Sequence, residues 1–136
     1  MSARAPETNA FPPLSPLAFL ERAAAVSADR VAIVDGARSF THAQFRDHCL
    51  RMARVLIELG IGPGDRVALL CPNELAMLAA HYAVPLAGGV LVPINTRLNS
   101  REIAYVLAHS GTKLLLHAPE FTDAVNDLDR GAPSRI

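Results

Sequence analysis

The chain has few residues of the kinds that mark specialised proteins. It contains no tryptophan, two cysteines and a single lysine, Lys113, among 136 residues. Because 13 basic residues balance 13 acidic ones, no charge excess would draw the protein to nucleic acid or to an anionic membrane. Two cysteines do not make a disulfide framework, so we interpret Cys49 and Cys71 as small buried hydrophobic residues.

No segment typical of secretion or of a membrane span is visible. The N-terminal residues lack the apolar stretch found in signal peptides. The most hydrophobic range, 76–94, is interrupted by His81, Pro85, Pro93 and a pair of glycines, which makes a membrane helix a poor interpretation. From these absences we expect a cytoplasmic protein.

Signatures of the common catalytic and nucleotide-binding sites are also missing. The sequence has no Walker-type phosphate loop, no G-x-G-x-x-G and no G-x-S-x-G nucleophile elbow. The five histidines show no metal-ligand spacing with cysteines or carboxylates. The sequence therefore assigns no catalytic residue and no metal ligand.

What the chain does contain is typical of a folded domain. Apolar residues make up 51% and charged residues 19%, a balance that favours a well-buried sheet. The length allows one domain with a substantial core. We expect residues 1–14 to be a loose N-terminal segment, 15–118 to form the domain, and 119–136 to be a divergent segment with a frayed end.

The spacing of apolar residues predicts helices that alternate with strands. Capping-box patterns begin two helices at Thr41 and Asn99, a third helix has Asn73 as its predicted cap, and Pro85 should kink or end that helix. The alternation argues for an α/β fold with a mainly parallel sheet, helices on both faces and right-handed crossovers. Helices are predicted over residues 16–27, 42–59, 74–87 and 100–110, strands over 31–34, 38–40, 66–71, 90–92 and 113–117, and 122–128 fit a short helix.

Polar residues follow the predicted strand at 90–92. Asn95, Thr96 and Arg97 lie where this strand passes into a loop, which is where ligands bind in open α/β sheets. Arg97 could present its forked donor to a phosphate. On spacing alone, the structural interpretation comes first: Asn95 satisfies loop backbone groups, and Arg97 lies on the surface or pairs with Glu102.

His81 lies in the middle of an apolar helix and allows two interpretations. It is either a hydrogen-bonded histidine in the core or facing another subunit, or a residue in the wall of a substrate pocket. The first is favoured, because buried polar groups are usually satisfied locally.

Short motifs occur in a fixed order along the chain, and together they resemble the start of the adenylate-forming acyl-CoA synthetases. The resemblance covers about residues 15–118. The segment from His81 to Gly88 is similar to the branch that activates short- and medium-chain or thioether-containing fatty acids, such as methylmercaptopropionate. The motifs are Asp35-Gly36-x-Arg38-x-x-Thr41, Gly64-Asp65-Arg66-Val67-Ala68, Pro72-Asn73, Ala87-Gly88-Gly89, Pro93-x-Asn95-x-Arg97-Leu98 and Glu102.

The resemblance implies a ligase that uses ATP and Mg²⁺ to turn a carboxylate into an acyl-adenylate, and then transfers the acyl group to coenzyme A. By the same match, Arg97 would lie near the nucleotide phosphate of coenzyme A. The family's phosphate loop, acyl pocket and catalytic lysine have no counterpart here, and Lys113 does not match that lysine. We therefore expect the N-terminal part of a larger AMP-binding-enzyme fold, inactive alone, whose partner is the missing C-terminal portion or a complementary chain.

Two other functions remain open at this point. The chain could be a non-catalytic remnant or binding module that pairs with a complementary or full-length chain, and a homo-oligomer is also compatible with the sequence. An unrelated small α/β nucleotide-binding domain would require a phosphate loop at a strand-to-helix turn, which the sequence does not show.

Overall fold

The computed structural model describes residues 15–128 and 134–135 of the chain. The expectations for residues 1–14, and for 129–133 and 136, fall outside this range. No helix in the described part is long and apolar enough to span a membrane. In chain order the elements are α1 (Pro16–Val26), β1 (Val31–Asp35), β2 (Arg38–Thr41), α2 (His42–Glu58), β3 (Arg66–Leu70), α3 (Leu75–Leu86), β4 (Val90–Pro93), α4 (Ser100–Ser110), β5 (Leu114–His117), the 3₁₀ turn η1 (Pro119–Phe121), α5 (Thr122–Asn126) and β6 (Ser134–Arg135).

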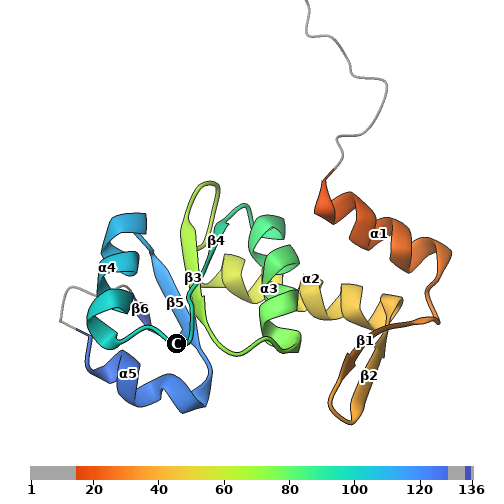
Figure 1. Ribbon diagram of the computed structural model, residues 1–136. Coiled ribbons are helices and arrows are strands. Elements are labelled where there is room, and N and C mark those ends of the chain that lie inside the picture. Colours follow the sequence, from red (N-terminus) through yellow and green to blue (C-terminus); the bar gives the residue numbers. More distant parts are fainter. Residues whose placement is uncertain (1–14, 129–133, 136) are drawn as a thin grey trace, which may run out of the picture.

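The strands form two separate sheets. Four strands pair in the order β4-β3-β5-β6, and all three pairings are parallel. Strands β1 and β2 form an antiparallel hairpin of their own. Figure 1 shows α4 and α5 beside one face of the four-stranded sheet, α2 and α3 on its other side, and the hairpin beyond them. The expected α/β fold with a mainly parallel sheet is confirmed.

The side chains of β3 alternate between two apolar clusters, which explains why helices cover both faces of the sheet. Val67 and Leu69 belong to an apolar cluster shared with α2 and α3. Ala68 and Leu70 belong to a second cluster shared with α4 and α5. Successive side chains of a strand point to opposite faces, so a continuous apolar strand needs cover on both. Full burial of a side chain such as Leu70 contributes roughly 1.5–3 kcal/mol to folding.

A third apolar cluster attaches the hairpin and α1 to the rest of the domain. It is built from the buried side chains of Leu20, Phe45, Cys49, Leu75 and Ala79, with Ile33 and Phe40 of the hairpin packed against it. Cys49 is fully buried and Cys71 nearly so, which confirms that both cysteines are buried hydrophobic residues.

The predicted capping boxes both form. The backbone N–H of Gln44 donates to Thr41 Oγ1 at 3.3 Å, and its side chain accepts from the Thr41 N–H at 2.9 Å. Asn99 and Glu102 exchange the equivalent bonds at 3.1 and 2.9 Å. Each box satisfies two donors that a helix start would otherwise leave unpaired, and a lost cap typically costs about 1 kcal/mol.

The prediction of Asn73 as a helix cap is wrong. Residue Glu74 occupies the cap position of α3, and its side chain makes no capping bond. The N–H of Glu74 instead donates to the Pro72 carbonyl oxygen at 2.9 Å, so Asn73 lies in a tight turn and the helix begins at Leu75. Pro85 lies one residue before the end of α3, in agreement with the expected early termination.

The C-terminal part needs one correction. Residues 122–128 do contain a short helix, α5, which follows the 3₁₀ turn η1. Ser134–Arg135, expected within a frayed end, pairs in parallel with Leu114 and Leu115 of β5. The pairing occupies an edge of β5 that would otherwise carry unpaired backbone groups, and a two-residue strand has no apolar pattern from which to predict it.

Candidate functional site

A cleft of about 640 Å³ opens where β3 and β4 end. The two strands are parallel neighbours, so their carboxyl ends, and the loops that follow, come together at one edge of the sheet. Helix α3 supplies the remaining wall. The lining residues are Cys71, Pro72, Asn73, Met77, His81, Pro93, Ile94, Asn95, Thr96 and Arg97.

The loop after β4 is held by backbone bonds and by Asn95. The Ile94 N–H donates to the Leu69 carbonyl oxygen at 2.9 Å, which continues the parallel pairing one residue past β4. Asn95 Oδ1 then accepts from the N–H of Arg97 at 3.0 Å. This bond folds the loop back on itself as an Asx-type turn. The structural interpretation of Asn95 therefore agrees with the structure.

Within the described residues, the side chain of Arg97 is an unpaired cation on the cleft wall. Arg97 is exposed, and the described residues give its guanidinium no hydrogen bond or ion pair. The alternative pairing with Glu102 does not form in the described residues, and Glu102 Oε2 accepts from the N–H of Asn99 at 2.9 Å. No carboxylate is among the residues that line the cleft, so nothing in its wall competes for the donors of Arg97.

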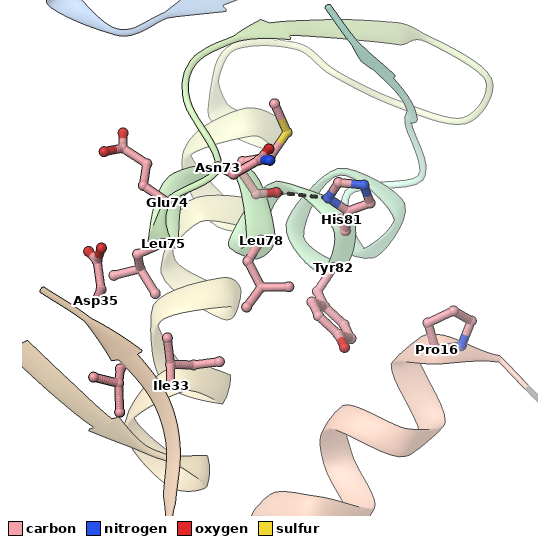
Figure 2. Close-up of a pocket in the computed structure, with 11 residues that line it drawn as sticks. Pro16, Ile33, Asp35, Asn73, Glu74, Leu75, Leu78, His81 and Tyr82 are labelled. Carbon is pink, nitrogen blue, oxygen red and sulfur yellow. Dashed lines mark hydrogen bonds between the residues drawn. The ribbon is translucent and has the colours of Figure 1, made fainter. Parts of the chain in front are cut away.

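His81 lies on the exposed side of α3, which excludes the core interpretation. Its Nδ1 is 2.8 Å from the Met77 carbonyl oxygen, and because a carbonyl only accepts, Nδ1 is the donor in this bond. Figure 2 shows this bond along the helix. His81 lines both this cleft and a neighbouring groove.

The thiol of Cys71 is expected to be unreactive in this cleft. Burial raises its pKa to about 11, with help from the negative charges of Glu74 and Glu120. The sulfur lies 3.3 Å from the Pro72 carbonyl oxygen, to which it donates. A protonated thiol is a poor nucleophile and a poor metal ligand. Within residues 15–128 and 134–135, no group of three His, Cys, Asp or Glu side chains could hold a metal ion.

Asn73 is a cleft residue to which sequence reasoning gave no site role, whereas Thr96 lies at the ligand edge where the strand-end rule placed it. Asn73 was assigned as a helix cap, although it follows the carboxyl end of β3 just as Asn95 follows that of β4. Applying the strand-end rule to both strands would have found it.

Other motifs of the ordered series are structural. Gly64 and Gly88 meet at the amino ends of β3 and β4, where the Gly64 N–H donates to the Gly88 carbonyl oxygen at 3.0 Å. A Cβ on Gly89 would lie 3.1 Å from the Asp65 carbonyl oxygen, a close contact that a glycine avoids. Asp35 and Arg38 form an ion pair across the hairpin turn. Of the ordered motifs, only Pro72-Asn73 and Pro93-x-Asn95-x-Arg97 line the cleft.

A family model described as "AMP-binding enzyme" matches residues 20–135. The chain belongs to the AMP-binding enzyme family. The sequence resemblance was assigned only as far as residue 118. The family match extends beyond it and includes the residues of β6.

Relatives of this AMP-binding enzyme segment are CoA ligases. The peroxisomal acetate/butyrate–CoA ligase AAE7 of Arabidopsis thaliana is 41% identical over 114 residues, which are 84% of this chain and 20% of the relative. The peroxisomal benzoate–CoA ligase of the same plant is 45% identical over 103 residues, or 76% of this chain and 18% of the relative. The chain thus spans about a fifth of the length of these curated relatives.

A solved structure supports the same assignment. The fatty acyl CoA synthetase of Mycobacterium tuberculosis superposes with a TM-score of 0.82 and 33% sequence identity. The superposition covers 88% of this chain and 26% of that structure. The α/β domain described above is therefore an N-terminal part of the AMP-binding enzyme fold.

Proposed function

We propose that this chain is the N-terminal segment of an AMP-forming acyl-CoA ligase, and that Arg97 binds a phosphate group of coenzyme A. One observation carries the proposal: the unpaired guanidinium of Arg97 stands on the wall of a cleft whose lining includes no carboxylate. The Asn95 turn fixes the backbone from which Arg97 projects, so the cation is held at the strand ends.

The electrostatics of this cleft favour an anion. A hydrogen bond from a guanidinium to a phosphate contributes about 1.5–3 kcal/mol, and the forked group can make two in parallel. Asn73 and Met77, on either side of the first turn of α3, both line the cleft. The partial positive charge at a helix start adds roughly 0.3–1 kcal/mol for a nearby anion.

The chain would supply binding groups and no catalytic ones. In the complete reaction, a carboxylate oxygen of the acid attacks the α-phosphorus of ATP and displaces pyrophosphate. The sulfur of coenzyme A then attacks the acyl carbon and displaces AMP. The described residues offer no carboxylate cluster fit to hold Mg²⁺, and Cys71 is protonated. We therefore expect this segment alone to be inactive.

The choice of acid is expected to lie outside this segment. Relatives named for acetate or butyrate and for benzoate match the chain with similar identities, 41% and 45%. A segment that set the size of the acyl pocket would be expected to match one of these classes better than the other.

A second candidate function is a non-catalytic binding module. In the described sheet β4 is an edge strand, and half of the Val90 surface is exposed. An exposed apolar edge favours association with another chain. An exposed β4 edge is also expected if the sheet continues in the rest of a ligase. An activity test must therefore separate the binding module from the ligase segment.

The test uses this chain alone and a fusion, defined as this chain joined to the part of AAE7 that follows its matched 114 residues. AMP and butyryl-CoA are measured with ATP, Mg²⁺, butyrate and coenzyme A, and the AAE7 part without this chain is the control. The proposal expects turnover only by the fusion. Turnover by the chain alone contradicts expected inactivity, and a folded but inactive fusion favours the binding module.

A further inference from the structure

A second hollow lies between the hairpin and α3 and shares Asn73, Met77 and His81 with the cleft. It is a groove of about 610 Å³, and Pro16 at the start of α1 is among its lining residues. Figure 2 shows the side chains of Ile33, Leu75, Leu78 and Tyr82 gathered in it. Its lining residues include the carboxylates Asp35 and Glu74 and no lysine or arginine, the opposite of the cleft that holds Arg97.

The groove runs along the free edge of β1. Three consecutive residues of this strand, Ile33, Val34 and Asp35, line it. Neighbouring side chains of a strand point to opposite faces, so a groove that touches all three borders the edge of the strand. β2 contributes no lining residue, and β1 pairs with no described strand except β2. The backbone groups on this edge are thus available to another strand.

Exposed apolar side chains flank this edge. Val34 is 73% exposed and Leu78 is 39% exposed. A two-stranded hairpin gains stability from a further strand or from packing on a helix, and in the described residues this hairpin has the packing of Ile33 and Phe40 on the third apolar cluster. A third strand would add to this stability and remove apolar surface from water.

The charges at one end of the groove define its occupant further. Asp35 is already paired with Arg38. Glu74 is exposed and has no hydrogen bond through its side chain and no ion pair within the described residues. Figure 2 shows the two carboxylates at the same end of the groove. A partner that places a lysine or arginine opposite Glu74 would complement this end.

We propose that an extended segment, from the four fifths of the enzyme that this chain does not span, adds a third strand to the free edge of β1. The length is available, because the chain covers only 20% of AAE7. Apolar side chains of the added strand cover Val34 and Leu78, and a basic side chain faces Glu74. The inference rests on the proposed function only in treating this chain as one segment of a larger enzyme.

Backbone hydrogen exchange tests strand addition directly. In the fusion, the amides of residues 31–35 should exchange at least about tenfold slower than in the isolated chain, because new inter-strand bonds protect them. The double variant Val34→Arg/Leu78→Arg should abolish most of this slowing. The control Val26→Arg changes a residue that is 77% exposed on α1 and outside the groove, and should leave the slowing intact.

Charge complementarity is tested in the same fusion. Glu74→Lys should accelerate exchange at residues 31–35, and Glu58→Lys, an exposed residue at the end of α2, should not. Protected amides in β3 must be equal in all samples, which shows that the domain is folded. Turnover is not the readout, so an inactive fusion with a protected β1 would contradict the proposed function and leave the strand addition standing.

Three results would overturn the proposal. Equal exchange of residues 31–35 in the fusion and in the isolated chain excludes an added strand. Exchange that slows as the concentration of the isolated chain rises identifies a second copy as the occupant. If deletion of residues 1–14 accelerates exchange at β1 in the isolated chain, the chain's own N-terminal segment covers the edge instead.

Discussion

Arg66 donates a hydrogen bond of 2.7 Å from Nη2 to the carbonyl oxygen of Gly111. The same guanidinium donates to the carbonyl oxygens of Ser110 and Gly64, each at 2.8 Å. Arg66 begins β3, while Gly111 ends α4 in the left-handed conformation, with φ of 61°. One cation thus satisfies the open end of α4 and fixes that helix to the central strand.

Replacing Gly111 should disturb this contact as well as the backbone. A Cβ at Gly111 would lie 2.8 Å from Arg66 Nη2, whereas a Cβ at Gly36, with nearly the same φ of 59°, meets nothing within 4 Å. Both Gly→Ala changes carry a left-handed penalty of about 1–2 kcal/mol. We expect Gly111→Ala to lose roughly 1 kcal/mol more than Gly36→Ala, from the weakened charged hydrogen bond. Urea unfolding measures both losses, and equal losses would contradict a stabilising role for Arg66.

The ion pair of Lys113 and Asp65 should make stability depend on pH in the acid range. The Lys113 ammonium lies 2.7 Å from Asp65 Oδ2, which also accepts from the Gly62 N–H at 2.9 Å. These hydrogen bonds, that of Lys113 foremost, lower the pKa of Asp65 below its ordinary value of 3.8. The stabilisation is therefore complete above the ordinary pKa and is lost as the pH falls through the lowered one.

Asp65→Asn should accordingly unfold at lower urea than the native chain at neutral pH, and this difference should shrink below about pH 3.9, the usual aspartate value. Asp29→Asn is the control, because Asp29 is exposed and the described residues give its side chain no partner. A difference that stays constant across the acid range would show that the charge of Asp65 does not stabilise the fold.

Both thiols should resist modification in the folded chain. Burial raises the pKa of Cys49 and that of Cys71 to about 11. Because the thiolate is the reactive form, each should react with Ellman's reagent about a hundredfold slower than in denaturant at the same mildly alkaline pH. The variants Cys49→Ala and Cys71→Ala show which reaction rate belongs to which thiol. Fast modification of Cys71 in the native chain would contradict its assignment as an inert cleft residue.

Local features were predictable from the sequence, and long-range ones were not. Both capping boxes involve residues three apart, so they can be recognised in the sequence. The bonds from Arg66 to Ser110 and from Lys113 to Asp65 join residues 44 and 48 positions apart, and no local pattern contains them. Asn73 was misassigned because a cap and a turn use the same residue types.

The candidate site was only half predictable. The strand-end rule placed Asn95 and Arg97 at a ligand edge, yet it could not show that the loop after β3 faces them, because the sequence does not reveal the strand order. The competing pair of Arg97 with Glu102 was plausible by spacing. It is absent from the described structure, in which Arg97 lines the cleft and one oxygen of the Glu102 carboxylate completes the capping box with Asn99.

The most direct test of the central claim is the affinity of the fusion for coenzyme A with Arg97→Ala. Calorimetric titration should show binding weakened about 10- to 100-fold, the equivalent of one charged hydrogen bond. Affinity for pantetheine, which has no nucleotide phosphate, should be unchanged. Arg101→Ala, an exposed arginine on α4 that does not line the cleft, should affect neither ligand. Unchanged coenzyme A affinity, or an equal loss for pantetheine, would contradict a phosphate contact by Arg97.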